Sequence, residues 1–283
     1  MLELKRIDVD FGRRDKSFPL NTYDLLKIFA IFSMVADHVN DFCGIHSVWL
    51  IALGRVAMPV FLFLVGFNGS NRIGWPLIIS FICVVPLQWE LRGTLLPLNI
   101  LFPIGLSRCL FRLYERLKLW RTPYPELMVA IGAFCAGLTS LIWEYGTIAL
   151  LWALFGRLRR DRHPLASAVG AVSALLLIAA YWPQFAGKHW LLTLVAASAW
   201  FVLAAVPIMH PLRIIVGGTV VKFVSRISLW IYVTHFVLII LVQKPLRTLS
   251  TADPIPFMNR HQSLTNYEPL NATVRRLELH LLS

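Results

Sequence analysis

Charged residues are scarce in this sequence, and their scarcity excludes an ordinary soluble domain. Only 15% of the 283 residues are Asp, Glu, Lys or Arg, whereas 57% are hydrophobic. Soluble domains carry about 25% charged residues. No repeat of fixed period is visible, and the inverted halves common in transporters are not seen either. The composition therefore predicts an all-α, polytopic transmembrane bundle of about 8 to 10 helices in a lipid bilayer.

Cysteine is also rare, and its spacing excludes two further classes of site. The four cysteines lie far apart, each in or beside an apolar stretch, at Cys43, Cys83, Cys109 and Cys135. Neither a disulfide framework nor a metal site has such spacing. We therefore expect no metal and interpret these residues as small buried hydrophobic side chains.

Acidic residues are outnumbered by basic ones, and the basic residues are unevenly distributed. A formal net charge of +12 comes from 27 Lys and Arg against 15 Asp and Glu. The basic residues gather before the first apolar stretch and in blocks at 108–121 and 157–162. This positive-inside pattern argues against nucleic acid as a partner and predicts a cytoplasmic N-terminus. Because Asp37 and His38 stand where a cleavage site would need small residues, we expect an uncleaved signal anchor.

About nine apolar stretches are candidates for membrane spans. They are 24–38, 48–67, 73–91, 95–113, 126–143, 146–158, 165–182, 189–208 and 227–242. The stretch 214–224 is too short to cross a membrane alone. After Gln243 the composition shifts to Pro, Asn, Thr and mixed charge. We therefore predict a membrane domain over 1–243 and a disordered tail over 244–283.

The first of these stretches carries ionisable residues at both ends. Lys27 stands near its start, and the pair Asp37 and His38 follows ten positions later with only apolar residues and Ser33 between. Eleven residues of α-helix rise about 16 Å, roughly half of a hydrocarbon core. An ionisable side chain at that depth predicts a functional site, although the pair could also end the helix at the far interface.

Other polar residues are expected at the same outer level of the bundle. Arg55 lies about seven residues into a helix that starts on that side, where it could form an ion pair with Asp37. Asn99, Glu144 and Tyr145 also face the outer half, although Glu144 and Tyr145 could simply lie at the interface.

A second histidine is expected near mid-depth. His235 lies about eight residues into a helix that enters from the cytoplasm, so it either joins the site or bonds a neighbouring helix.

These residues occur in blocks that resemble one family, the TraX family of polytopic membrane acetyltransferases. The blocks are Tyr23 to Lys27 with Asp37 and His38, Gly54 to Leu64 with Gly66 and Phe67, Asn99 to Phe102, Glu144 to Gly146, Phe155 to Arg157, and Tyr232 to His235. The resemblance covers about Leu20 to Val242. Its first block also occurs in the broader superfamily of membrane acyltransferases that modify glycans from acyl-CoA.

The resemblance implies an activity and roles for particular residues. The family is known for acetylating the N-terminal amine of pilin subunits in bacterial conjugation and fimbrial systems. The resemblance therefore implies the bacterial inner membrane as location, acetyl-CoA as donor substrate and a pilin or fimbrial subunit as acceptor. Within the broader superfamily, the histidine that matches His38 is the one usually assigned to catalysis. Phosphates of cytoplasmic acetyl-CoA would need basic residues, for which Lys27, Arg112, Arg116, Lys118, Arg157 and Arg159 are available, although positive-inside topology explains most of these as well.

The residues themselves fit acyl transfer. A neutral imidazole at His38 can take the proton of the attacking amine or hydroxyl, and the adjacent catalytic candidate Asp37 can raise its basicity or orient it. Because neighbouring positions on a helix point about 100° apart, we expect Asp37 to anchor Arg55 rather than to contact His38 directly. Arg55 or Asn99 can stabilise an oxyanion, and Glu144, Tyr145, His235 and Lys27 complete the substrate-binding set that we expect. Two other classes remain open: a proton-coupled small-solute transporter with the same ionisable residues, and a non-enzymatic membrane scaffold.

Overall fold

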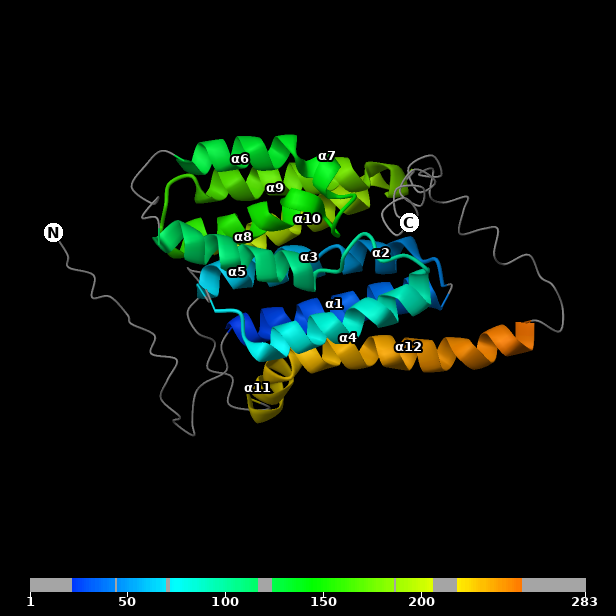
Figure 1. Cartoon of the computed structure of the whole chain (residues 1–283). Coiled ribbons are helices and arrows are strands. Elements are labelled where there is room, and N and C mark those ends of the chain that lie inside the picture. Colours follow the sequence, from blue (N-terminus) through cyan, green and yellow to red (C-terminus); the bar gives the residue numbers. More distant parts are fainter. Residues whose placement is uncertain are drawn as a thin grey trace, which may run out of the picture.

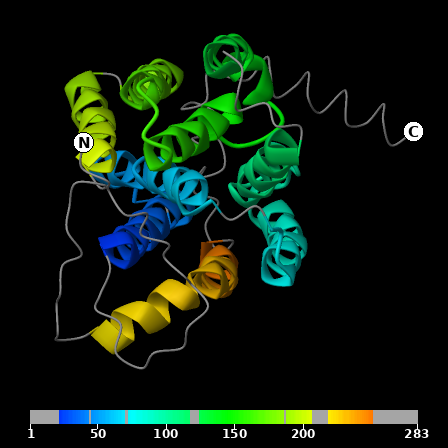
Figure 2. The same cartoon turned by 90° about the vertical axis from the view of Figure 1, so that its left-hand side faces the viewer.

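The computed structural model describes residues 22–43, 45–69, 72–116, 124–185, 187–205 and 218–250. Across these residues the structure is helical and contains no strand, so the predicted all-α class is confirmed. Most of the longer helices run side by side along one direction, and α11 lies across them at one end (Figure 1). Figure 2 looks along the bundle from that end and shows the helices around a shared interior.

The chain forms twelve α-helices within the described residues. The first five are α1 (Thr22–Phe42), α2 (Val48–Gly54), α3 (Ala57–Asn68), α4 (Trp75–Arg92) and α5 (Leu101–Arg116). The next five are α6 (Tyr124–Phe134), α7 (Ala136–Thr139), α8 (Gly146–Arg160), α9 (Ala166–Tyr181) and α10 (His189–Ala205), with a short 3₁₀ helix, Trp182–Phe185, after α9. The last two are α11 (Gly218–Arg226) and α12 (Ser228–Ser250).

Proline accounts for two differences from the predicted spans. The stretch 48–67 is divided between α2 and α3 at Arg55 and Val56. Pro59 cannot donate to the Arg55 carbonyl four residues earlier, and its ring crowds that carbonyl, which breaks the helix there. The stretch predicted from Leu95 begins its helix only at Leu101, because the residue before Pro97 is disfavoured in a helix.

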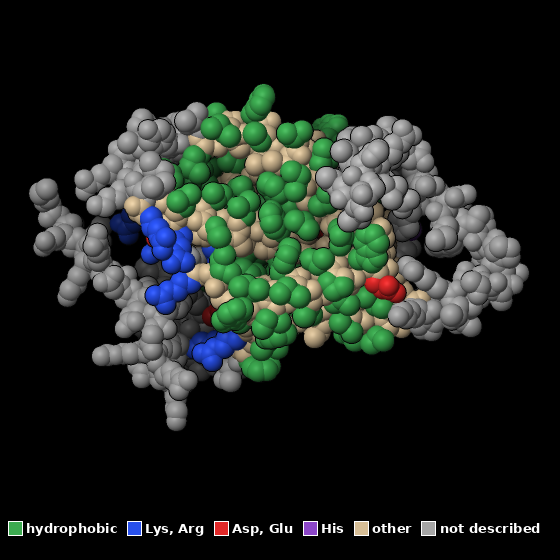
Figure 3. All heavy atoms as spheres, viewed as in Figure 1, with side chains coloured by type: hydrophobic (Ala, Val, Ile, Leu, Met, Phe, Trp, Pro, Cys, Tyr) green, Lys and Arg blue, Asp and Glu red, His purple; other side chains and the backbone are tan. Residues whose placement is uncertain are grey.

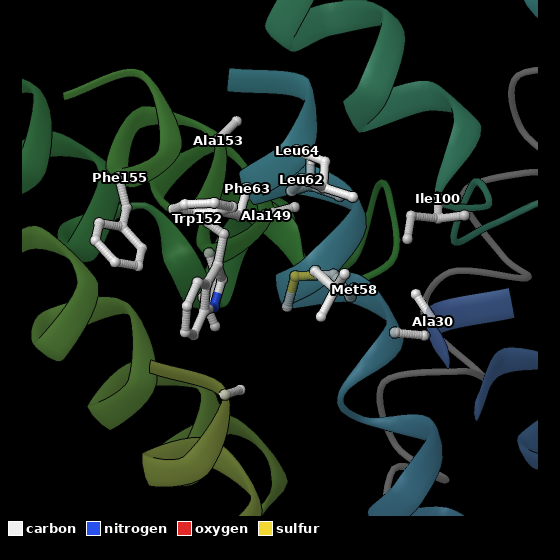
Figure 4. Packing of buried hydrophobic residues seen from close by; sticks show 14 of the residues in the cluster. Ala30, Met58, Leu62, Phe63, Leu64, Ile100, Ala149, Trp152, Ala153 and Phe155 are labelled. Atoms are coloured by element: carbon white, nitrogen blue, oxygen red, sulfur yellow. The ribbon is translucent and has the colours of Figure 1, made fainter. Parts of the chain in front are cut away.

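Helices α3 and α8 form the centre of the core. Their backbones approach so closely that a Cβ added to Gly66 would lie 1.8 Å from the Ala153 carbonyl oxygen, and one added to Gly156 would lie 2.1 Å from that of Phe63. Large side chains fill the space on either side, as Figure 4 shows for Met58, Leu62, Phe63, Trp152 and Phe155. Two glycines thus allow the contact on which the bundle is built.

The outer surface is mostly apolar around the middle of the bundle. Phe32, Ile82, Phe134, Leu175 and Phe201 are each more than 60% exposed. Figure 3 shows hydrophobic side chains across this belt and Lys and Arg gathered at one end. That end holds the last turns of α5 and α8, with Arg116, Arg157, Arg159 and Arg160. This distribution is typical of a protein that sits in a bilayer.

Two helical segments in the described part of the chain are long and apolar enough to cross a membrane. They are Val48–Asn68, which combines α2 and α3, and Ala166–Phe185. Two shorter apolar helices, His189–Ala205 and Ser228–Gln243, fall below that length. Helix α12 itself continues to Ser250, past the predicted domain boundary at residue 243. The remainder of the predicted tail, 251–283, lies outside the described residues.

Candidate functional site

Two histidines from opposite ends of the sequence meet in the bundle. His38 on α1 and His235 on α12 share a hydrogen bond of 2.6 Å between Nδ1 and Nε2. Their ring planes are 11° apart and their centroids 4.9 Å apart, so the two rings meet edge to edge through these nitrogens. Phe42 and Phe236 surround His38 with ring centroids 5.9 and 4.9 Å away. The structure thus unites two predicted site residues that are 197 positions apart.

Asp37 packs against Gly54, where α1 contacts the end of α2. A Cβ added to Gly54 would lie 2.2 Å from the Asp37 Cβ and 2.3 Å from its Cγ. Any side chain at position 54 would clash with Asp37, which explains why glycine precedes Arg55. Asp37 attracts Arg55 through space, but the predicted ion pair between them is not formed among the described residues.

Arg55 contacts two aromatic residues instead. Its guanidinium donates to the Tyr145 hydroxyl at 3.3 Å and lies over the Tyr181 ring, 4.3 Å from the centroid. Tyr145 has a left-handed backbone with φ of 67° immediately before α8. A non-glycine residue in that conformation is uncommon and is often found where a side chain is held for function.

Glu144 forms an ion pair that the sequence did not indicate. Its Oε1 accepts from Arg92 Nη1 at 2.8 Å, with side chains 18% and 25% exposed. The Arg92 guanidinium also lies 5.8 Å from the centroid of the Phe42 ring. Glu144 is therefore mostly buried, and its charge is neutralised by Arg92 in the last turn of α4.

A short backbone bridge positions Glu144 beside Asn99. Leu98 and Trp143 form an isolated parallel β-bridge. The Leu98 N–H donates to the Ile142 carbonyl oxygen, and the Glu144 N–H donates to the Leu98 carbonyl oxygen. The Asn99 side-chain oxygen accepts from the Leu101 N–H at 3.0 Å and so caps α5. Asn99 is 1% exposed, and its Nδ2 has no hydrogen-bond partner within the described ranges.

A small cavity lies among these residues. Its volume is about 20 Å³, room for roughly one water molecule. The lining residues are Met34, Asp37, His38, Gly54, Ala57, Met58, Ile100, Glu144, Tyr145 and Tyr232. Arg55 and Asn99 each adjoin a lining residue in sequence, and Arg55 Nε is also buried without a partner in the part of the chain that the structure describes. Neither Arg55 nor Asn99 lines the cavity itself, but each carries a buried N–H donor that is unpartnered among the described residues.

Lys27 is not part of this group. Its Nζ donates to the Ser225 carbonyl on α11 at 2.5 Å, and the Ser225 hydroxyl donates to Asp24 at 2.6 Å. Lys27 is eleven residues before His38, about 16 Å along α1. The structure thus gives Lys27 a role in holding α11 against α1, at the end of the bundle where basic residues gather.

Three residues of the site were not predicted as site residues from the sequence. Arg92, Tyr181 and Tyr232 each contribute a contact or line the cavity. Arg92 follows a long apolar stretch and looks like an ordinary interfacial cation. Tyr232 stands three positions before His235 in a helix, a spacing that places both on one face and could have indicated it.

Comparison with known proteins connects the chain to one family. A family model described as TraX protein matches residues 22–243. Protein TraX of Escherichia coli is 30% identical over 140 residues, 45% of this chain and 52% of its own length. An uncharacterized protein of Rickettsia prowazekii is 28% identical over 137 residues, 48% of this chain and 55% of its own length.

Each of these two alignments spans about half the length of the curated relative. No solved structure matches the chain significantly. The family match, in contrast, covers most of the chain and includes every helix that contributes a residue to the site. The protein therefore belongs to the TraX family.

Proposed function

We propose that this protein is an integral-membrane acyltransferase that transfers an acetyl group from acetyl-CoA to an acceptor across the bacterial inner membrane. The acceptor in this proposal is the N-terminal amine of a pilin or fimbrial subunit. The chain crosses the membrane several times, with its N-terminus in the cytoplasm. Membership of the TraX family and the apolar belt with basic residues at one end support this proposal.

The observation that carries the proposal is the set of groups around the cavity. His38 lines the cavity and offers a ring nitrogen for proton transfer. Arg55 and Asn99 follow and precede the lining residues Gly54 and Ile100 in the chain, and each has a buried N–H that is unpartnered within the described ranges. A base beside spare hydrogen-bond donors is what acyl transfer requires. The Tyr181 ring and the Tyr145 hydroxyl hold the Arg55 guanidinium in place, so that it needs little reorganisation during the reaction.

In the proposed reaction, the acceptor nitrogen attacks the thioester carbonyl while His38 takes its proton. The carbonyl oxygen becomes an oxyanion that accepts from Arg55 or Asn99. When the C–S bond breaks, the proton held by His38 passes to the CoA sulfur, which leaves as the thiol. An amide and free CoA are the products. The cavity has room for roughly one water molecule, so entry of an acetyl group requires lining side chains to move.

The donor would enter from the basic end of the bundle. Arg112 and Arg116 are exposed there, whereas Arg157 is already paired with Glu115 and Asp161. Exposed guanidinium groups can bind phosphate in a bidentate manner. From that end the pantetheine arm of CoA would have to extend about 16 Å along α1, from the level of Lys27 to His38.

Binding of acetyl-CoA to detergent-purified protein tests the donor side of this proposal. We expect saturable binding by calorimetry, weakened about tenfold when Arg112→Ala and Arg116→Ala are combined, and unchanged in His38→Ala. Lys188→Ala removes an exposed cation beyond the other end of α9 and serves as control. Folded wild-type protein that binds no acetyl-CoA would contradict the proposal, as would equal weakening by the control variant.

A further inference from the structure

The hydrogen bonds of the histidine pair determine which ring nitrogens carry hydrogen. His235 Nδ1 lies 3.1 Å from the Ile231 carbonyl oxygen, one turn earlier in α12. A carbonyl oxygen can only accept, so His235 Nδ1 must be the N–H donor of this contact. In a neutral imidazole the other nitrogen is then a bare acceptor. His235 Nε2 is therefore an acceptor.

This acceptor faces His38. Because His235 Nε2 accepts, the 2.6 Å contact requires His38 Nδ1 to be the donor. Neutral His38 then carries its hydrogen on Nδ1 and a lone pair on Nε2. No hydrogen-bond partner for Nε2 exists among the described residues, and His38 lines the cavity. The basic nitrogen is thus the one left available to a substrate.

We propose that His235 is a positioning residue that holds His38 in this tautomer and in this ring orientation. The inference rests on the proposed function, since it specifies how His38 serves as the base. The chain of hydrogen bonds runs from the Ile231 carbonyl through His235 to His38 Nδ1. A second histidine thereby takes the place that a carboxylate occupies in a catalytic triad.

The same chain of hydrogen bonds can carry a proton between the two histidines during acyl transfer. When His38 Nε2 takes the proton of the acceptor amine, His38 holds hydrogen on both nitrogens and is positively charged. Its Nδ1 hydrogen can move across the 2.6 Å contact to His235 Nε2, which places the charge on His235 and leaves His38 neutral. Return of that hydrogen to His38 Nδ1 precedes release of the Nε2 proton to the CoA sulfur. No oxidant or further reactant is needed.

The surroundings of the pair explain why a neutral partner serves here. His235 is 5% exposed and lies against Tyr232 and Phe236, with ring centroids 5.4 and 4.5 Å away. A carboxylate buried beside these rings would carry a permanent and costly charge. A histidine instead carries charge only while the proton is in transit. His235 can therefore lie among aromatic rings without a permanent counterion.

Nitrogen NMR of detergent-solubilised protein containing ¹⁵N-labelled histidine tests the tautomer directly. His38 is assigned by comparison with His38→Ala, and two-bond couplings to the ring carbon-bound hydrogens identify its protonated nitrogen. We expect hydrogen on Nδ1 in the wild type. Hydrogen on Nε2 of His38 would overturn the inference. Because this measurement needs no turnover, it decides the question even if the protein transfers no acetyl group.

Variants of His235 supply the second readout. His235→Leu removes the acceptor and is expected to lower acetyl transfer at least tenfold and to populate the Nε2–H tautomer of His38. His235→Gln can place an amide oxygen where Nε2 stood and should restore most of the activity and the Nδ1–H tautomer. Unchanged turnover in His235→Leu would overturn the role of His235 while leaving His38 as the base. Loss in both variants with an unchanged tautomer would also overturn it.

Discussion

The close contact between α3 and α8 makes a quantitative prediction about stability. In Gly156→Ala the added Cβ would lie 2.1 Å from the Phe63 carbonyl oxygen, whereas ordinary contacts of this kind are longer than about 3.2 Å. The obstacle is backbone and cannot rotate away, so the two helices must separate by about 1 Å. Core side chains between them, including Trp152 at 0% exposure, then lose contacts. Overpacking of this kind costs about 1–3 kcal/mol or more.

Unfolding in mixed micelles, followed by tryptophan fluorescence, measures this cost. Gly137→Ala is the matched control, because a Cβ added to Gly137 in α7 meets nothing within 4 Å. Alanine at an unobstructed helical position is expected to be neutral or to stabilise by about 0.5–1 kcal/mol. The reasoning would be refuted if Gly156→Ala unfolded at the same denaturant concentration as the wild type, or if both variants lost stability equally.

Three further predictions concern the site. Glu144→Gln should destabilise the protein by about 2 kcal/mol, because it leaves the half-buried Arg92 without its partner, and adding Arg92→Gln should recover part of the loss in the same unfolding assay. Arg55→Lys keeps the charge but loses the planar contact with Tyr181, so stability should fall by about 1–2 kcal/mol and acetyl transfer should fall as well. Asn99→Ser retains an oxygen to cap α5 but lacks the Nδ2 donor, so stability should change by less than about 1 kcal/mol while acetyl transfer drops about tenfold.

Each of these predictions has an outcome that contradicts it. Additive losses in the double variant of Arg92 and Glu144 would mean that the ion pair contributes nothing. Full activity and stability in Arg55→Lys would show that charge alone matters at that position. Asn99→Ser with normal turnover would remove the amide from the proposed oxyanion site, and a large loss of stability would reduce Asn99 to a helix cap.

Sequence reasoning located the site better than it described the contacts within it. Counting residues from the outer side brought Asp37, Arg55 and Glu144 to one level, because helical rise is fixed at about 1.5 Å per residue. Their partners could not be found in this way. Arg55 binds two tyrosines rather than Asp37. This depends on how α8 packs against α3 and how α9 packs against α8, which no local sequence pattern indicates.

Long-range pairing and helix breaks show the same limit. The contact of His38 with His235 spans 197 positions and follows from the placement of α12 against α1 and α4. Each histidine was a candidate alone, but sequence periodicity does not say which helices are neighbours. The division of α2 from α3 could have been predicted, since Pro59 removes the hydrogen bond to the Arg55 carbonyl.

Transfer of labelled acetyl from acetyl-CoA to the N-terminal amine of a pilin-derived peptide tests the central claim most directly. Purified wild-type protein should catalyse it, and His38→Ala should be slower by about 10² to 10⁴. His189→Ala, which alters a histidine stacked on Trp182 away from the cavity, should retain the wild-type rate. Equal rates for folded wild type and His38→Ala would contradict the account.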